Sequence, residues 1–101
     1  MNEKFKGIFP ALLTPFDGQD RVDTEVLGRL VDYNLQKGVD GFYVAGSTAE
    51  VFLLDAKERL AVMETVSSRA GGKCTLIAHI GCISTKQAIE YAREAKEMGY
   101  D

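Results

Sequence analysis

The chain has 101 residues, of which 46% are hydrophobic and 27% charged, and its formal net charge is -3. Domains most often have about 100–150 residues, so the chain can hold at most one. A weakly acidic balance without blocks of lysine and arginine argues against nucleic acid or an anionic membrane as a partner. The apolar runs are shorter than the about 20 residues that span a bilayer, and residues 1–9 lack the apolar region of a secretory signal.

The two cysteines, Cys74 and Cys82, are expected to be free thiols. Cys74 opens an expected strand and Cys82 follows its end. Because extended chain rises about 3.3 Å per residue, the two should lie far beyond the about 7 Å limit for a disulfide. One histidine and two cysteines supply too few ligands for a metal site, and no cofactor is expected. Cytoplasmic localisation follows as the default.

The first third of the chain predicts a strand followed by a helix. Residues 8–13, IFPALL, read as a short buried strand, although Pro10 cannot donate a hydrogen bond to a neighbouring strand. After a polar loop, Asp23 fits the N-cap of a helix whose apolar residues recur at helical spacing. Gly38 is a suitable residue to end it.

Two more units of the same kind follow. Residues 39–45 are almost continuously apolar, as in a parallel strand that is covered on both faces. Asp55 and Glu58 form an acidic version of the capping box for a helix that ends at Gly71-Gly72. Residues 74–80, CTLIAHI, predict a third strand. Ser84 and Gln87 then begin a last helix, which ends at Gly99.

The resulting order is strand–helix, three times, at a period of roughly 30 residues, which indicates parallel strands with helical crossovers. An open doubly wound sheet and an eightfold barrel both use this alternation. The segment after the first strand, LLTPF, lacks the glycine-rich phosphate loop of the open sheet, so the barrel is favoured. We therefore expect an α/β fold, with residues 1–101 forming the first three βα units, the N-terminal part of a single TIM-barrel domain.

Three of eight units would leave apolar faces uncovered. Each large apolar side chain left in water forfeits roughly 1.5–3 kcal/mol, against a total domain stability of about 5–15 kcal/mol. We therefore expect the chain to be the N-terminal segment of a longer polypeptide, or to need complementary chain in order to fold.

Candidate functional residues lie where the expected strands end, because a parallel barrel carries its site at the C-terminal ends of strands. The most polar of these ends is Gly46-Ser47-Thr48-Ala49-Glu50. Successive backbone N–H groups after a glycine, with Ser47 and Thr48 adding hydroxyl donors, could hold a carboxylate or a phosphate. Alternatively, the two hydroxyls could merely satisfy backbone groups of a tight loop.

Other polar residues have competing interpretations. Glu50 could act as a general base or could anchor N–H groups of its own loop. His79 could be a catalyst or a satisfied core residue. The rest are assigned structural parts: helix capping by Ser84 and Thr85, structural pairing by Arg59, and packing in a core or interface by Tyr43 and Tyr33.

The chain resembles a known superfamily. Gly46-Ser47-Thr48-Ala49-Glu50, followed by Glu58-Arg59, resembles the G-[ST]-T-G-E … E-R signature of the N-acetylneuraminate lyase and dihydrodipicolinate synthase superfamily. Residues 11–16, ALLTPF, resemble its first strand and loop. Ser47 and residues 79–85, HIGCIST, resemble the sialic acid lyase branch.

This resemblance implies a class I aldolase on a (β/α)8 barrel, usually a homotetramer, which cleaves sialic acid to N-acetylmannosamine and pyruvate. An active-site lysine forms a Schiff base with the keto carbon of pyruvate, and a tyrosine shuttles the proton. The Ser-Thr pair holds the pyruvate carboxylate and helps the tyrosine in this proton transfer. Ser47 and Thr48 are accordingly the expected substrate-binding residues, with small-molecule substrates as partners.

Two features depart from the family pattern. Ala49 stands where the family has glycine, which would cost roughly 1 kcal/mol or more if the position requires positive φ. In addition, every lysine lies before a strand or on a helix, not at the C-terminal end of a strand: Lys4, Lys6, Lys37, Lys57, Lys73, Lys86 and Lys96. The resemblance therefore places the Schiff-base lysine and the relay tyrosine beyond Asp101. No catalytic residue is expected in this chain, and the chain alone should be inactive.

Two alternatives remain open. The protein could be another aldolase of the superfamily, such as a dihydrodipicolinate synthase that acts on aspartate semialdehyde. It could also be a truncated, non-catalytic barrel fragment that serves as an assembly partner. The nucleotides that follow the codon of Asp101 separate a fragmentary record from a true truncation.

Overall fold

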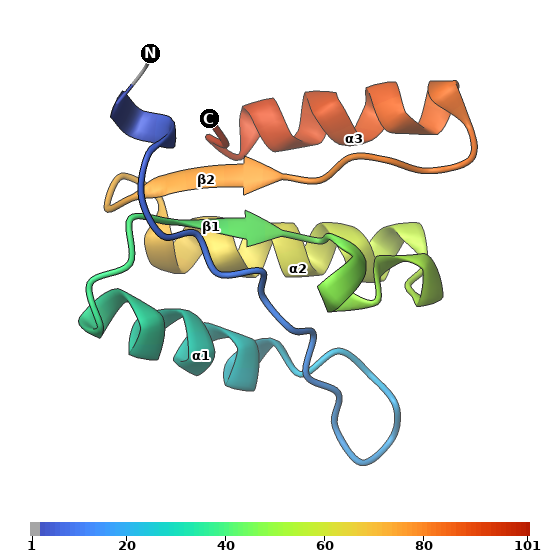
Figure 1. Cartoon of the computed structure of the whole chain (residues 1–101). Coiled ribbons are helices and arrows are strands. Elements are labelled where there is room, and N and C mark those ends of the chain that lie inside the picture. The colour runs from blue at the N-terminus through green and yellow to red at the C-terminus, as the bar shows by residue number, and fades with distance from the viewer. Residues whose placement is uncertain (1–2) are drawn as a thin grey trace.

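The computed structural model describes residues 3–101 and shows helices alternating with a parallel sheet (Figure 1). Strands β1 (Gly41–Val44) and β2 (Thr75–Ala78) pair in parallel, with Gly41 opposite Thr75 and Val44 opposite Ala78. The remaining elements are α1 (Thr24–Gln36), α2 (Ala56–Ala70), α3 (Thr85–Glu97) and the short 3-10 turns η1 (Glu3–Phe5), η2 (Ser47–Ala49) and η3 (Val51–Leu53).

All three helices begin at the residues that the sequence predicts. The Asp23 carboxylate accepts a hydrogen bond from the Val26 N–H at the start of α1. Asp55 and Glu58 form the complete capping box of α2. The Ser84 hydroxyl accepts from the Gln87 N–H at the start of α3. These side chains satisfy N–H groups that have no partner within the helix.

The expected first strand is not formed as such, and this corrects the prediction for residues 8–13. Ala11 makes only an isolated parallel bridge to Tyr43 of β1. Three backbone hydrogen bonds hold the segment beside β1. The oxygens of Ile8 and Pro10 accept from the N–H groups of Asp40 and Tyr43, and the Leu12 N–H donates to Tyr43 O. Pro10 has no N–H to contribute, so a regular ladder cannot run through it. Residues 3–101 therefore contain two strands and three α-helices, and the count of three complete βα units is not confirmed.

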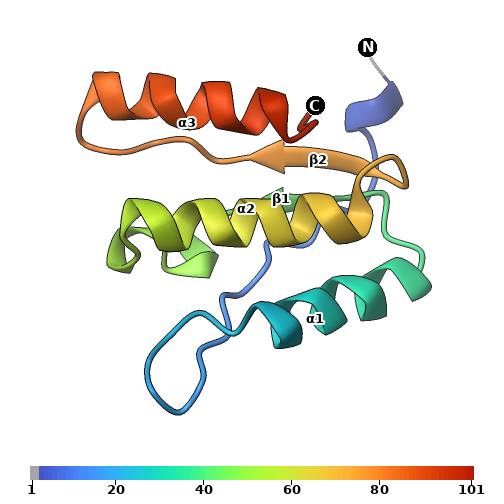
Figure 2. The same cartoon turned by 180° about the vertical axis from the view of Figure 1, so that it is seen from behind.

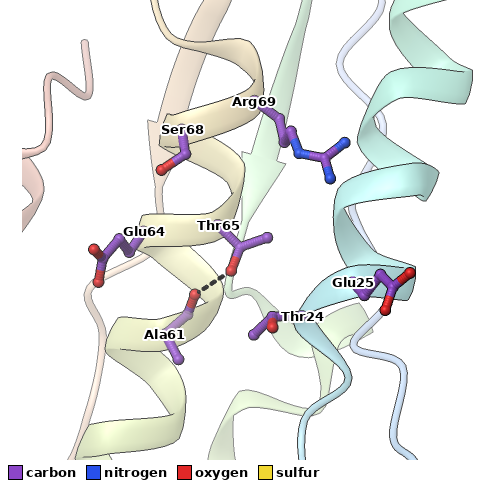
Figure 3. A pocket seen from close by; sticks show the side chains of 7 residues that line it. All are labelled: Thr24, Glu25, Ala61, Glu64, Thr65, Ser68 and Arg69. Carbon is purple, nitrogen blue, oxygen red and sulfur yellow. Dashed lines mark hydrogen bonds between the residues drawn. The ribbon is translucent and has the colours of Figure 1, made fainter.

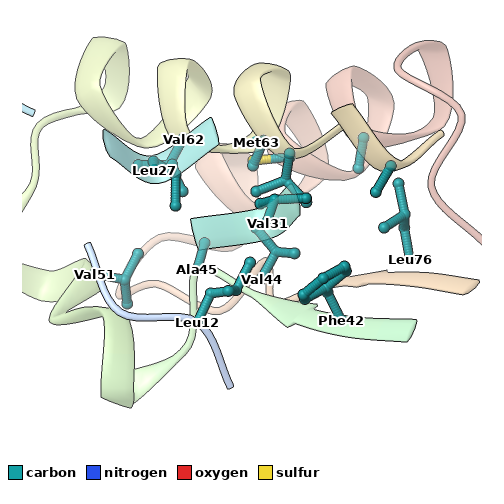
Figure 4. Close-up of a cluster of buried hydrophobic side chains, with 13 residues drawn as sticks. Leu12, Leu27, Val31, Phe42, Val44, Ala45, Val51, Val62, Met63 and Leu76 are labelled. Carbon is teal, nitrogen blue, oxygen red and sulfur yellow. The ribbon is translucent and has the colours of Figure 1, made fainter. Parts of the chain in front are cut away.

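The core lies between the helices and one face of the sheet. Helix α2 packs against both strands and against α1, and it covers the sheet from behind in the view of Figure 1 and in front in the reverse view of Figure 2. Figure 4 shows Leu27 and Val31 of α1, Phe42 of β1 and Met63 of α2 meeting in this layer, all fully buried. Burial of each such side chain stabilises the fold by about 1.5–3 kcal/mol.

The opposite face of the sheet is different. Successive strand side chains point to opposite faces, so Tyr43 and Ile77 lie on the side away from α2, and both are only half-buried. Figures 1 and 2 show no helix of the described chain over that side. Several large apolar side chains of residues 3–101 are exposed, among them Ile8, Leu13, Phe52, Leu53 and Ile83. The chain thus presents apolar surface that it does not itself cover.

Both cysteines are free thiols. Within residues 3–101, none of the helices combines the length and the apolar character needed to cross a bilayer.

Candidate functional site

The loop that follows β1 carries the two hydroxyl residues that the sequence singles out. Ser47 and Thr48 form the first turn of η2, and both are exposed. Neither hydroxyl has a hydrogen-bond partner within residues 3–101. The alternative that these side chains satisfy backbone groups of their own loop therefore does not hold in this structure. Two adjacent donors remain available to an oxygen-rich ligand.

Backbone geometry at this loop is unusual on either side of the hydroxyls. Ala45 has a φ of 62° and Glu50 a φ of 57°, both in the left-handed region that L-residues rarely adopt. Ala49, the residue that replaces the family glycine, is not among the positive-φ residues, so its Cβ meets no such penalty. The strain falls on Ala45 and Glu50 instead, where strand β1 leaves the sheet and where η2 ends.

Close packing explains the glycine that precedes the hydroxyls. Gly46 has a φ of -91°, so its backbone would accept any residue. A Cβ there, however, would lie 2.5 Å from Cε1 of Tyr43. Tyr43 therefore occupies the space against Gly46, and the glycine is required by the contact rather than by its backbone angles.

Thr14 closes the loop from the N-terminal segment. Its Oγ1 donates a 2.7 Å hydrogen bond to the carbonyl oxygen of Ala49, and the residue is buried. The sequence places Thr14 at the end of the expected first strand, one of three strand ends where functional residues are expected, but assigns it no role. Its position directly after the apolar run of residues 8–13 was the only signal in the sequence that Thr14 could be buried and hydrogen-bonded.

His79 lies at the corresponding end of β2 and is half-buried. Its Nδ1 lies 3.0 Å from the carbonyl oxygen of Ala45, and its ring is 6.2 Å from those of Tyr43 and Phe52, measured between centroids. A Cβ on Gly81 would lie 2.7 Å from Nε2 of His79. The histidine is thus bonded and packed, and it joins the ends of the two strands.

Arg59 of α2 braces the chain that follows β2. It is only 3% exposed, and its Nη1 and Nη2 donate to the carbonyl oxygens of Gly81 (2.9 Å) and His79 (2.7 Å). The guanidinium also stacks on the ring of Tyr91, 4.2 Å from its centroid. Its Nε is buried without a hydrogen-bond partner in the described chain. The expected structural pairing is therefore with carbonyl oxygens and not with an acid.

The other candidates divide into structural and exposed residues. Ser84 caps α3 as predicted, whereas Thr85 is simply the first residue of that helix. Tyr33 is exposed and lies beneath the ammonium of Lys37. The Glu50 carboxylate is exposed and forms no hydrogen bond or ion pair within residues 3–101, so it does not anchor the loop as one interpretation proposed.

No lysine belongs to the loop after β1, residues 45–55, or to the segment between β2 and α3, residues 79–84. All seven lysines lie on helices, beside them, or before a strand. The described residues also contain no group of three or more metal-ligating side chains. Within residues 3–101, the loop after β1 thus presents two available hydroxyl donors and no lysine for covalent chemistry.

A groove lies between α1 and α2 (Figure 3). It has a volume of about 440 Å³ and is lined by Thr24, Glu25, Ala61, Glu64, Thr65, Ser68 and Arg69. Its polar groups are partly engaged, since Thr65 donates to the oxygen of Ala61 and Arg69 pairs with Asp32. None of the predicted site residues lines this groove.

Comparisons with known proteins agree with this architecture. The Dihydrodipicolinate synthetase family matches residues 4–101. The N-acetylneuraminate lyase of Enterobacter sp. (strain 638) is 48% identical over all 101 residues, which correspond to 34% of that protein. The chain thus spans about a third of the length of the curated relatives that it matches.

Solved structures of TIM-barrel enzymes show the same fold. The Ruminococcus gnavus sialic acid aldolase, crystallised as a catalytic lysine mutant, superimposes with a TM-score of 0.94 at 39% identity, covering 98% of this chain and 32% of its own. YagE of Escherichia coli K12, a dihydrodipicolinic acid synthase family protein solved in complex with pyruvate, gives 0.91 at 28% identity, covering 96% and 33%. With residues 4–101 matched, the chain belongs to the dihydrodipicolinate synthetase family.

Proposed function

We propose that this chain is the N-terminal third of an N-acetylneuraminate lyase, in which Ser47 and Thr48 hold the carboxylate of pyruvate and of the pyruvate-derived end of sialic acid. The observation that carries the proposal is the pair of exposed hydroxyls without partners in the described chain, placed directly after β1. The 48% identity to a lyase of that name favours this member of the family over a dihydrodipicolinate synthase.

The proposed reaction divides its labour between this chain and the remainder of the barrel. A lysine from beyond Asp101 condenses with the keto carbon of the substrate and releases water. The hydroxyl on the second carbon from the iminium then gives its proton to the relay tyrosine from beyond Asp101, and the bond between that carbon and the carbon next to the iminium breaks. Its electron pair passes to the iminium to form an enamine, and N-acetylmannosamine leaves as the aldehyde. The remaining enamine is protonated and hydrolysed to pyruvate, which regenerates the lysine.

Residues of this chain act by binding and orientation. The Ser47 and Thr48 hydroxyls donate hydrogen bonds to the carboxylate, and such charge-assisted bonds are roughly twice as strong as neutral ones. With the carboxylate fixed, the neighbouring keto carbon is held at one position relative to the lysine. Such positioning lowers the barrier to condensation.

The test requires a polypeptide in which residues 1–101 are followed by the missing two thirds, here termed the completed barrel. That remainder comes from the chain's own gene or, if the reading frame ends after Asp101, from a 48%-identical relative. Pyruvate and borohydride should trap a covalent adduct on the completed barrel and none on residues 1–101 alone. Replacing Ser47 and Thr48 together by alanine should raise the half-saturating pyruvate concentration roughly 10- to 100-fold.

Thr65 and Ser68 provide a matched control. They are also a hydroxyl pair, on α2 in the groove of Figure 3, and their double alanine variant removes the same chemistry away from the strand ends. We expect that variant to trap pyruvate like the unmodified protein. Absence of any adduct would rule out Schiff-base chemistry, while unchanged pyruvate capture by the Ser47 and Thr48 variant would rule out their role. Release of N-acetylmannosamine from sialic acid, compared with turnover of aspartate semialdehyde, then separates the lyase from the synthase.

A further inference from the structure

His79 holds two successive carbonyl oxygens at the end of β1. Its backbone N–H donates to Val44 O at 2.9 Å, and its Nδ1 lies 3.0 Å from Ala45 O. A carbonyl oxygen can only accept, so Nδ1 must carry the proton in this contact. In a regular parallel ladder, successive carbonyls point to opposite sides of a strand, and one neighbouring residue cannot reach both.

The left-handed conformation of Ala45 accounts for this double contact. At a φ of 62°, the chain turns at Ala45, so the carbonyl after Val44 also comes within reach of His79. Ala45 is fully buried, and a buried carbonyl without a partner would destabilise this conformation. The imidazole therefore stabilises a backbone turn that an alanine does not favour by itself.

We propose that His79 is a positioning residue for the anion-binding loop: its imidazole fixes the turn at Ala45 and thereby sets the direction in which Ser47 and Thr48 leave β1. This inference rests on the proposed function, because it assigns to His79 the task of orienting the groups that hold the substrate carboxylate. His79 itself does not take part in the chemistry.

The imidazole can perform this task because its own position is fixed. Arg59 holds the carbonyl oxygen of His79 at 2.7 Å, a backbone contact that does not depend on the imidazole. The rings of Tyr43 and Phe52 pack near its ring, and the missing Cβ of Gly81 leaves room for Nε2. A ring held on several sides transmits its position to Ala45 with little freedom.

Two replacements of His79 in the completed barrel separate the hydrogen bond from the bulk of the side chain. His79→Asn keeps an N–H donor on the atom next to Cγ, where Nδ1 stands, whereas His79→Leu fills the space without a donor. In the synthesis direction, we expect His79→Leu to raise the KM for pyruvate about 5- to 10-fold and to leave the KM for N-acetylmannosamine within about twofold. His79→Asn should stay within about twofold of the unmodified protein for both substrates.

Cys82→Ser is the control, because Cys82 lies on the same segment and its thiol donates to the carbonyl oxygen of Ser84, with no hydrogen bond to β1 or to the loop after it within residues 3–101. It should change neither KM. A merely structural role for His79 would lower kcat or the yield of folded protein without raising the KM for pyruvate selectively. Equal KM values for His79→Leu and the unmodified protein would overturn the inference.

A measurement on the unmodified protein covers the case in which His79→Leu does not fold. Nitrogen NMR of the imidazole should show the proton on Nδ1 in the neutral form; a neutral ring protonated only on Nε2 would overturn the inference. If the unmodified protein forms no pyruvate adduct, the proposed function fails. If it forms the adduct and the Nδ1 proton is absent, only the role of His79 fails.

Discussion

At the N-terminal end of the two strands, polar side chains bond back onto the fold. At the C-terminal end some do so as well, such as Thr14 and Arg59, whereas the adjacent hydroxyls of Ser47 and Thr48 have no partner within residues 3–101. The Asp40 carboxylate accepts from the Ile8 N–H at 2.8 Å, and Thr75 Oγ1 donates to Lys4 O at 2.6 Å. Asp101 accepts from the Leu76 N–H at 3.0 Å and pairs with the Lys4 ammonium at 3.3 Å. Each of these carboxylates and hydroxyls has a partner within the chain.

The other end combines strain with unsatisfied donors. Ala45 and Glu50 adopt left-handed angles there, and the hydroxyls of Ser47 and Thr48 have no partner in the described residues. The structure therefore has bonded polar side chains at both ends of the sheet, and at the C-terminal end it also leaves the two adjacent hydroxyls of Ser47 and Thr48 available. In barrels of parallel strands, chemistry is carried at the C-terminal ends, and the available hydroxyls of this chain lie at that end of the strands.

Among the substitutions at the two ends, the largest change in the free energy of unfolding is expected at Arg59, which bonds the chain that follows β2 at its C-terminal end. Arg59→Met should lower the free energy of unfolding of the completed barrel by about 2–4 kcal/mol, because the carbonyl oxygens of His79 and Gly81 lose their donors. Arg59→Lys should recover less than half, since an ammonium cannot replace a planar group that forks between two acceptors and stacks on Tyr91. Urea unfolding measures the free energy of unfolding of both variants, provided that its slope against urea concentration is the same as in the unmodified protein.

Arg93 is the control for this substitution, because it is exposed and pairs only with Glu90 on α3. Arg93→Met should change the free energy of unfolding by less than about 0.5 kcal/mol. An Arg59→Met variant as stable as Arg93→Met would mean that the guanidinium does not support the C-terminal end.

A smaller effect is expected at the N-terminal end, where Asp101→Ala removes the acceptor of the Leu76 N–H and the partner of Lys4. We expect a loss of roughly 1 kcal/mol at neutral pH, since solvent screens the ion pair. The Leu76 N–H, and then Lys4, lower the pKa of Asp101 from its ordinary 3.8. The stabilisation is therefore present above pH 3.8 and is lost as pH falls through the lowered pKa.

The difference between Asp101→Ala and the unmodified protein should consequently shrink toward zero in acid, when unfolding is followed from pH 7 to pH 2. Glu64→Ala, which removes an exposed carboxylate of α2, should show no such convergence. A constant difference over the whole range would contradict the charge-dependent role of Asp101.

Tyr100, the neighbour of Asp101, gives a comparable effect with the opposite pH dependence. Its hydroxyl donates to Met63 O at 2.7 Å, so Tyr100→Phe should cost about 1 kcal/mol at neutral pH. Burial raises the pKa of the Tyr100 phenol well above its ordinary 10.0. Its contribution is therefore fully present below pH 10 and is lost as pH rises through the raised pKa. The free energies of unfolding of Tyr100→Phe and of the unmodified protein, followed against pH, should therefore approach each other above pH 10. A constant difference between them would contradict this role of Tyr100.

The smallest effect is expected at Glu50, whose left-handed conformation suits glycine. Glu50→Gly relieves this backbone angle and loses no hydrogen bond of the described chain, while glycine adds flexibility to the unfolded state. The two effects nearly cancel, so the free energy of unfolding, measured by thermal unfolding, should change by less than about 1 kcal/mol in either direction. Glu50→Val, which adds a branched Cβ at the same φ, should be clearly destabilising by comparison. Equal stability of the two variants would show that the strain at Glu50 is not significant.

Helix limits and the family were accessible from the sequence because they depend on short-range signals. Asp23, Asp55 and Ser84 stand at N-caps, and glycines follow α1 and α3, with φ of 85° at Gly38 and 89° at Gly99. A cap acts through atoms three residues away, so its chemistry can be read directly from the letters. The hydroxyl pair at residues 47 and 48 was found in the same way, from a turn that follows an apolar run.

Tertiary structure alone decided the contacts that join distant segments. Pro10 prevented a regular first strand, but only its place beside β1 showed which bonds remained. The bond from Thr14 to Ala49 and the contact of His79 with Ala45 span 35 and 34 residues, and the left-handed angle of Ala45 has no signature in its letter. Such contacts arise when the C-terminal ends of neighbouring strands are brought together by packing of their helices, and sequence periodicity carries no information on which side chain then meets which carbonyl.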